Sequence, residues 1–263
     1  MTGALAALLW TLAFCWSTAP GPAIADLLPA PPLPPERSLW VNFEILPSNR
    51  AAPLPPSLRE IESGRLRTEE KTIEGKVYRK TSITLPLANG DRRELIILLA
   101  EEDGHLRMLG FHRALHQRDT SQERTTVFQA GAANPLSGDP VQVPADTYSY
   151  LALCTALASF ERATPPVPLH VWFQGSLLPV DLVFEGSEKL DVLGAATGSV
   201  RIRIKPRGGK GPEAIYWFGD QPPHLLLQYR GPGDFLTAEG EAAPSVVLRA
   251  TASSEQVRSI FRN

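Results

Sequence analysis

Residues 93–114, RELIILLAEEDGHLRMLGFHRA, predict two β-strands joined by a tight turn. Residues 95–99 are apolar at every position, which is typical of a central strand covered on both faces. Asp103-Gly104 is a dipeptide that hairpin turns favour, and a second strand-like segment, residues 105–114, follows it. This stretch therefore predicts an antiparallel hairpin inside a sheet.

The same pattern continues on both sides of this hairpin. Between residues 65 and 131, short strand-like segments alternate with turn residues such as Asn89-Gly90, so neighbouring strands are expected to pair in sequence order. With a first strand at residues 39–46, this predicts a meander over residues 38–131. Strands are predicted again at residues 169–174, 178–185, 188–193, 198–205, 214–218, 224–230, 234–239 and 246–252.

A helical period separates these two groups of strands. Four residues have the i, i+3, i+4, i+7 spacing of one apolar helix face: Tyr150, Leu153, Cys154 and Leu157. A proline pair at residues 165–166 prevents the helix from continuing. We therefore predict one main α-helix over about residues 146–162, with the cysteine on its buried face.

Taken together, these elements predict a mainly β fold. The expected architecture is a large curled antiparallel sheet or a partly open β-barrel, with the helix at 146–162 plugging its concave side. Residues 38–253 are expected to form a single domain, in which the meander 38–131 precedes a helix plus sheet at 144–253. Residues 254–263 predict a short terminal helix or tail.

The first 25 residues have the order of a cleavable secretory signal peptide. An uncharged apolar run at residues 4–16 is followed by Pro20-Gly21-Pro22 and by small residues that predict cleavage after Ala25. No Lys or Arg precedes the run, so an uncleaved membrane anchor stays open as an alternative. Residues 26–37, rich in proline, predict a disordered tether. The predicted localisation is periplasmic or secreted, with no membrane span in the mature chain.

Charge and cysteine content narrow the classes of partner. The net charge of −2 argues against nucleic acid, which calls for a strong excess of basic residues. Cys15 leaves with the predicted signal peptide and Cys154 remains alone, so the mature chain has no intramolecular disulfide.

Short motifs in the second half give the chain a family resemblance. These are Asp146-Thr147-Tyr148-Ser149-Tyr150-Leu151, the strand pair at 177–184 and 189–193, the strand at 200–204, and Trp217-Phe218-Gly219-Asp220 followed by Pro223 and Leu225. Over about residues 144–242 the chain resembles an exported bacterial family called a domain of unknown function, built of antiparallel strands around a helix. The resemblance implies a half-barrel similar to that of periplasmic lipoprotein carriers, which hold an acyl chain in the concavity, and it brings no catalytic residues.

Catalytic and metal-binding patterns give weaker interpretations. His112 and His116 lie on a predicted strand, where residues i and i+4 stand about 13 Å apart at roughly 3.3 Å per residue, too far to share one metal. No Gly-x-Ser-x-Gly motif is present, Cys154 is expected to be packed, and the glycine-rich residues 208–211 lack the P-loop spacing. We predict a non-enzymatic protein with no catalytic residue, no metal site and no cofactor.

Two surfaces remain as candidates for binding. The basic set Arg201, Arg203, Lys205, Arg207 and Lys210 is interpreted as a solvated strand face, with an anionic head group or cell-wall polymer as the alternative. Large aromatic side chains on two strands are the preferred ligand-binding candidates: Trp172, Phe173, Tyr216 and Trp217.

The leading functional hypothesis is an exported protein that binds a lipid or another apolar or amphipathic envelope ligand on the concave face of its sheet. A barrel interior filled by side chains, with no space left for a ligand, would overturn it. The alternative is an envelope scaffold that binds another envelope protein through an exposed strand edge. A hydrolase of envelope polymers ranks last, because the sequence offers no convergent polar groups.

Overall fold

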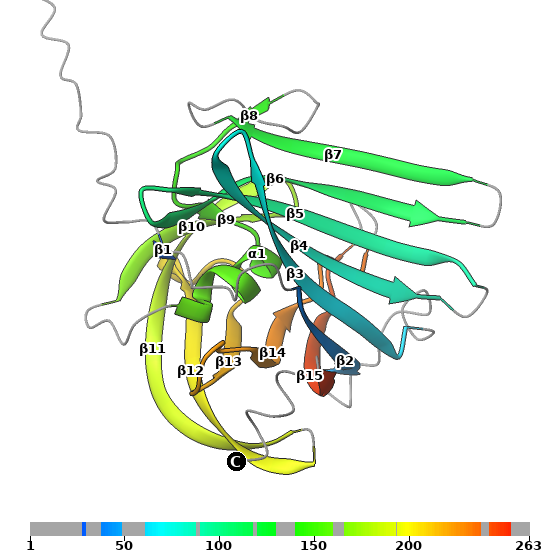
Figure 1. The fold of residues 1–263 in the computed structure, drawn as a ribbon. Helices are drawn as coiled ribbons and strands as arrows, with labels where there is room; N and C mark the ends of the chain where they lie inside the picture. Colours follow the sequence, from blue (N-terminus) through cyan, green and yellow to red (C-terminus); the bar gives the residue numbers. More distant parts are fainter. Residues whose placement is uncertain are drawn as a thin grey trace, which may run out of the picture.

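A computed structural model gives the fold (Figure 1). It describes residues 28–29, 38–48, 61–87, 90–117, 120–129, 140–159, 166–192, 194–237 and 242–253. The predicted signal peptide, most of the predicted tether and the predicted terminal segment 254–263 lie outside these residues. None of the described helices is both long and apolar enough to cross a bilayer.

Almost all regular structure in the described residues is β-strand. The strands are β1 (Leu28–Pro29), β2 (Leu39–Pro47), β3 (Ser63–Ile73), β4 (Lys76–Pro86), β5 (Arg92–Glu102), β6 (His105–His116), β7 (Ser121–Gln129), β8 (Pro140–Gln142), β9 (Thr147–Tyr148), β10 (Val167–Phe173), β11 (Ser176–Val192), β12 (Ala195–Pro206), β13 (Ala214–Gly219), β14 (Leu226–Pro232) and β15 (Ser245–Ser253). The helical elements are α1 (Tyr150–Ala156) and the 3₁₀ turns η3 (Leu157–Ser159) and η4 (Arg207–Gly209).

All these strands belong to one sheet. Its order is β8-β7-β6-β5-β4-β3-β2-β15-β14-β13-β12-β11-β10-β9, with β1 paired to β6 beside this path. Neighbours pair antiparallel except at the two ends, where β8 on β7 and β9 on β10 are parallel. The end strands do not pair with each other within the described residues, so the sheet curls strongly without closing into a barrel. This confirms the predicted mainly β, partly open architecture.

Alternating side chains explain how the curled sheet encloses a core. In β2, Leu39, Val41, Phe43 and Ile45 are buried and the residues between them are half-buried. This period of two is the pattern of a strand with one face on a core. Residues 95–99 follow it too: Leu95, Ile97 and Leu99 are buried, but Ile96 and Leu98 are only half-buried. The strand is therefore fully covered on one face and only partly on the other, where Leu98 packs against a small buried cluster of Tyr78, Ala100 and Leu109.

The helix α1 lies inside the concavity of the sheet (Figure 1), and all seven of its residues are buried. It is shorter than the predicted helix 146–162. Thr147 and Tyr148 extend the sheet as β9, and Ser149 caps the helix by accepting a hydrogen bond from the backbone N–H of Ala152 at 3.1 Å. Beyond residue 156 the chain tightens into η3, and residues 160–162 lie outside the described part.

Three strand predictions also differ from the structure. Residues 178–185 and 188–193 were predicted as separate strands, but they belong to the single strand β11, whose register shifts by a bulge between Phe184 and Gly186. Residues 234–239 were predicted as a strand, but 234–236 form a turn in which the Leu236 N–H donates to the Gly233 carbonyl. Within the predicted tether, Leu28 and Pro29 pair with β6.

Candidate functional site

The centre of the concavity is filled by side chains. The largest fully buried side chains include Tyr150 of α1 and, from other parts of the chain, Phe43, Tyr148, Tyr216 and Tyr229. The hydroxyl groups of these tyrosines are satisfied internally: Tyr216 donates to the Tyr150 carbonyl at 2.8 Å, and Tyr229 donates to the Pro232 carbonyl at 2.8 Å. The middle of the curled sheet is therefore a packed core, and space for a ligand has to be sought nearer its margins.

One such space lies where the two ends of the sheet approach each other. β7 and β10, the strands next to the end strands β8 and β9, contribute to the wall of a cavity of about 130 Å³. We call it the seam cavity; it is lined by Leu95, Phe111, Arg113, Arg124, Thr126, Val141, Ser149, Leu151, Trp172, Gln174, Gly175, Asp234 and Thr237. A more open hollow of about 270 Å³, the outer hollow, shares Leu95, Arg113, Arg124 and Thr237 with it.

An aromatic and aliphatic wall forms one side of the seam cavity. The ring of Trp172, half-buried on β10, meets Phe128 edge-on with centroids 5.4 Å apart. Phe128 in turn meets Phe111 of β6 edge-on at 6.1 Å. Leu151, in the first turn of α1, is buried and completes the wall. Such a surface suits the apolar part of a small molecule.

Three arginines on neighbouring strands form the opposite, polar side. Arg93 of β5, Arg113 of β6 and Arg124 of β7 share the inner face of the sheet, and Arg113 stands directly opposite Arg124 in the strand register. All three line the outer hollow, and the last two also line the seam cavity. The half-buried guanidinium group of Arg113 also lies over the Phe111 ring, 5.2 Å from its centroid.

Residues 233–237, which we call the strap, cross this polar side and are fixed by the arginines. Arg113 donates through Nη1 to the backbone carbonyl of Asp234 at 3.2 Å, and Arg93 donates to the backbone carbonyl of Leu236. The carboxylate of Asp234 lies 3.8 Å from Arg113 Nη2. The strap thus lines part of the cavity through Asp234 and Thr237, while two of its backbone carbonyls accept hydrogen bonds from Arg113 and Arg93.

The electrostatics of Asp234 are unusual for a carboxyl group. Burial raises its pKa to about 6, although Arg113 and backbone N–H groups act in the opposite direction. Asp234 Oδ1 and Arg113 Nε are both buried and have no hydrogen-bond partner within the described part of the chain. The cavity wall therefore carries one unsatisfied acceptor and one unsatisfied donor, a combination that usually marks a place for water or a polar ligand.

The four aromatic residues predicted from the sequence do not share one surface. Trp172 lines the seam cavity. Phe173 is half-buried and packs edge-on against Tyr150, with ring centroids 5.7 Å apart. Tyr216 is fully buried in the core. Trp217 follows it on the opposite face of β13, where its Nε1 donates to Glu188 Oε1 and the Arg201 guanidinium lies 5.5 Å from the ring centroid.

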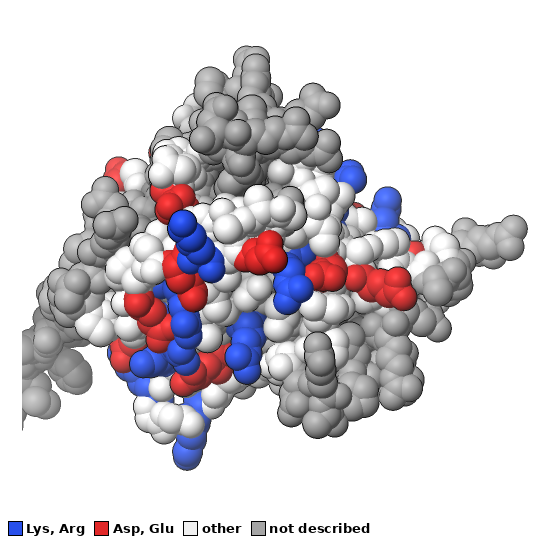
Figure 2. All heavy atoms as spheres, turned by 90° about the horizontal axis from the view of Figure 1, so that it is seen from below, with Lys and Arg blue, Asp and Glu red and all other residues white. Residues whose placement is uncertain are grey.

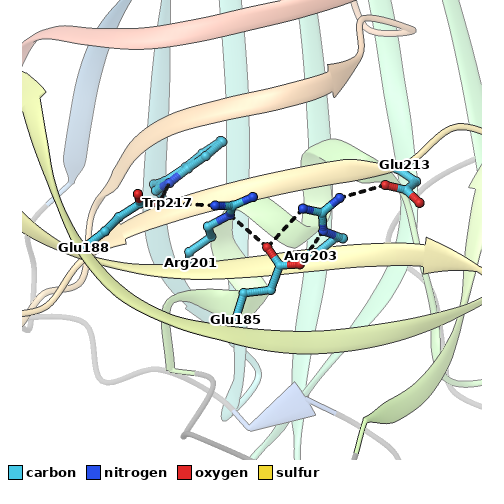
Figure 3. A network of polar contacts seen from close by, with 6 residues as sticks. All are labelled: Glu185, Glu188, Arg201, Arg203, Glu213 and Trp217. Atoms are coloured by element: carbon cyan, nitrogen blue, oxygen red, sulfur yellow. Dashed lines mark hydrogen bonds and ion pairs between the residues drawn. The ribbon is translucent and has the colours of Figure 1, made fainter.

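The predicted basic surface is an interleaved network of opposite charges (Figures 2 and 3). Glu185 is the residue at the β11 bulge that has no Cα partner on β12, and its side chain accepts from Arg203 and pairs with Arg201 Nε at 2.8 Å. Arg203 also donates to Glu213 at 2.9 Å, and Arg207 to Asp181 at 2.8 Å. These arginines are already matched by carboxylates, as on a solvated strand face.

The histidines and the cysteine also lie apart from the seam cavity. His112 and His116 alternate with Arg113, which places them on the outer face of β6; their side chains contact Thr125 Oγ1 at 2.9 Å and Glu94 at 3.6 Å respectively. The part of the chain that the structure describes contains no cluster of three or more His, Cys, Asp and Glu side chains able to hold a metal. Cys154 is buried on α1, and burial raises the pKa of its thiol.

Sequence reasoning missed the three arginines and Asp234. One signal was available for Arg93, because it shares the period of two with the buried residues 95, 97 and 99. Neither the register that sets Arg113 against Arg124 nor the return of the strap to this place can be obtained from local pattern.

Comparisons with known proteins give little further information. No family model matches the chain, and none of the curated proteins matches it in sequence. Among solved structures, it is similar to the crystal structure of a β-barrel-like protein of the domain of unknown function DUF1849 from Brucella abortus. The identity is 8%, the similarity covers 80% of this chain and 95% of that chain, and the TM-score is 0.30.

Proposed function

We propose that this chain is an exported, non-enzymatic protein that binds a small amphipathic ligand in the seam cavity. The observation that carries the proposal is the two-sided wall of that cavity, with Trp172, Phe111 and Leu151 on one side and charged or polar groups on the other. The predicted signal peptide is the reason for placing the protein in the periplasm or outside the cell.

The volume of the cavity sets the size of the ligand. A typical pocket for a drug-sized molecule holds roughly 300 to 1,000 Å³, whereas the seam cavity measures about 130 Å³ and shares part of its wall with the larger outer hollow. One short alkyl chain, or one segment of a larger molecule, matches this space. Burial of each methylene contributes about 0.8 kcal/mol, so that a chain of several carbons reaches useful affinity without filling the core.

The position of the cavity also favours binding over a purely structural role. It lies at the seam, where the sheet is not continued by hydrogen bonds within the described residues, so a ligand reaches the apolar wall without separating paired strands. The strap contributes Asp234 and Thr237 to the lining of the cavity, and side-chain contacts from two arginines hold it there.

Native mass spectrometry of the full chain, purified gently from its own cells before and after organic extraction, tests the proposal. We expect an adduct of defined mass that extraction removes. Thr126→Phe should abolish the adduct, because Thr126 lines the cavity. Thr125→Phe is the matched control, since Thr125 lies on the other face of β7 and contacts His112. An adduct that survives Thr126→Phe, or no adduct with any amphiphile added afterwards, would contradict the proposal.

The scaffold alternative keeps support from one observation. β8 pairs with β7 only at residues 127–129, so the outer edge of residues 121–126 has no neighbouring strand within the described part of the chain. An extended peptide from an envelope protein can add to such an edge through backbone hydrogen bonds. Loss of partner binding after Thr125→Pro, with the seam cavity still loaded, would favour this alternative.

A further inference from the structure

We infer that the ligand of the seam cavity carries an uncharged head group that both donates and accepts a hydrogen bond, a hydroxyl or a primary amide, bound by Asp234 and Arg113. The inference rests on the proposed function and names the chemical class of its ligand. It places the head group beside these two side chains and the alkyl chain along Phe111 and Trp172 of the apolar wall.

Two polar atoms without partners are the first argument. Asp234 is 7% exposed, and its Oδ1 has no hydrogen-bond partner within the described part of the chain. The Nε of Arg113, which also lines the seam cavity, lacks a partner among the same residues. Because both atoms are shielded from solvent, bulk water does not satisfy them, and an unpaired buried donor or acceptor costs free energy. A polar group bound in the cavity would satisfy both.

The balance of charge is the second argument. The Asp234 carboxylate lies 3.8 Å from Arg113 Nη2, so the two side chains form an ion pair whose charges offset each other. A charged head group would disturb this pair and leave one charge unpaired in a largely buried place. Arg124, the remaining charged residue of the lining, is exposed and has an interaction of its own, so it does not call for an anionic ligand.

The third argument is the kind of group that satisfies both atoms. A hydroxyl oxygen can accept from Arg113 Nε while its hydrogen is donated to Asp234 Oδ1, and a primary amide offers the same two functions. By contrast, an ether or a carboxylate only accepts, and an ammonium group only donates. The uncharged hydroxyl side chains of Ser149, Thr126 and Thr237 also line the cavity and are able to bond to the same kinds of group.

The position of Arg113 connects the polar and the apolar sides of the cavity. Its guanidinium group lies over the Phe111 ring, 5.2 Å from the centroid. The Phe111 ring meets Phe128 edge-on at 6.1 Å, and Phe128 meets Trp172 at 5.4 Å. A head group bound by Arg113 therefore has the apolar wall next to it, and a chain attached to that head group can lie along the wall.

Isothermal titration of the full-length protein at neutral pH tests the head group, after unfolding in urea and refolding have released any native ligand. The probes share a chain of six carbons. Hexanol and hexanamide donate and accept, hexyl methyl ether only accepts, and hexanoate and hexylammonium are charged. We expect hexanol and hexanamide to bind at least about tenfold more tightly than the other probes, because one hydrogen bond to a charged group accounts for about that factor.

The variant Asp234→Asn assigns the effect to the carboxylate. The change keeps the size of the side chain but removes the charge that balances Arg113. We expect the affinity for hexanol to fall about tenfold and that for hexanoate to rise about tenfold, a pair of opposite changes that unfolding does not produce. Asp181→Asn is the matched control and should change neither affinity, because Asp181 pairs with Arg207 and does not line the cavity. Circular dichroism shows whether each variant is folded.

The outcomes separate this inference from the proposed function. Equal affinity for hexanol and hexyl methyl ether would mean that an ordered water satisfies the two atoms, which overturns the head group and keeps the amphipathic ligand. Tighter binding of hexanoate or hexylammonium than of hexanol to the parent protein would also overturn the head group, as would an unchanged order of affinities in Asp234→Asn. No binding of any of these probes would overturn both.

Discussion

The hydroxyl oxygens of Thr155 on α1 and Thr81 on β4 lie 2.7 Å apart, although 74 residues separate them in the chain. Thr68 of β3 approaches the same helix hydroxyl at 3.3 Å. All three residues are buried, so this cluster is a polar contact inside an otherwise apolar core and fixes the helix against two strands.

Replacing Thr155 with valine should therefore destabilise the fold. The change keeps the volume but leaves two buried threonine hydroxyls with a lost partner, which costs about 1–3 kcal/mol. Urea unfolding followed by circular dichroism measures the free energy of unfolding. The control is Thr251→Val, since Thr251 is exposed and donates to the Asn42 carbonyl. Equal losses in the two variants would show that the cluster has no special role.

The backbone of β14 leaves no room for a side chain at Gly231. A Cβ there would lie 2.6 Å from the Tyr229 hydroxyl oxygen and 2.9 Å from the Ala214 Cβ, both in the buried core. We expect Gly231→Ala to cost about 1–3 kcal/mol through overpacking. In a double-mutant cycle, Tyr229→Leu should relieve part of that cost, because it removes the nearest ring. Strictly additive free energies would contradict this explanation.

Because its pKa is raised, Asp234 should make the stability of the fold depend on pH in the direction opposite to that of most acidic residues. Its folded-state pKa of about 6 lies above the ordinary 3.8, so the folded protein binds its proton more tightly than the unfolded chain. The stability from this group is complete below about pH 4, declines as the pH rises to about 6, and is constant above that. Asp234→Asn should thus gain about 2–3 kcal/mol relative to the parent between pH 4 and pH 7.5.

The measurement is urea unfolding of both proteins at the two pH values, which cancels the titration of other groups. The contact between Arg113 Nη2 and the Asp234 carboxylate, at 3.8 Å, identifies the ion pair that Asp234→Asn removes. The same difference in free energy at both pH values would show that the carboxyl group titrates normally.

Glu185 should show the pH dependence of stability that is usual for an acidic residue in an ion pair, and it serves as a comparison with Asp234. Burial alone would raise its pKa, but the hydrogen bond from Arg203 and the charges of Arg203 and Arg201 lower it below the ordinary 4.5. Its contribution is therefore present above about pH 4.5 and is lost as the pH falls through the lowered value. Glu185→Gln should destabilise the protein at pH 7 by roughly 1 kcal/mol or less, and by progressively less as the pH falls through the lowered pKa.

Thermal unfolding in low and high salt checks the origin of that effect. Its size at pH 7 should shrink in about 0.5 M salt, because the network is partly exposed. A loss at pH 7 that high salt leaves unchanged would assign the role of Glu185 to packing at the β11 bulge instead of charge.

The strand meander could be predicted from the sequence because its turns are indicated by short local motifs of turn-forming residues. Asp103-Gly104 and Gly75 have positive φ angles in the structure, as tight hairpin turns require, and the strands between them pair in sequence order. The start of the helix could not be predicted in this way. Residues 147–148 fit the helical period but form a strand instead, because they pair with β10, which lies about twenty residues further along the chain.

The candidate site was predicted only in part for the same reason. Trp172 was recognised because a large aromatic side chain on a strand is visible in the sequence. The arginines were not, because a charged residue inside a strand normally indicates a solvated face, and only the fold shows that Arg113 and Arg124 meet on the inner one. The strap reaches Arg113 across 121 residues, beyond the range of any local pattern.

The four residues 143–146 that join β8 to β9 connect the two ends of the sheet. They form a covalent link between the two end strands, which no backbone hydrogen bonds join within the described residues. Five Cα–Cα steps from Gln142 to Thr147 span at most roughly 17 Å. The end of β8 and the start of β9 cannot move further apart than this distance. Cutting the chain at this linkage would remove that limit, and the separation of the two ends of the sheet would then depend only on non-covalent packing.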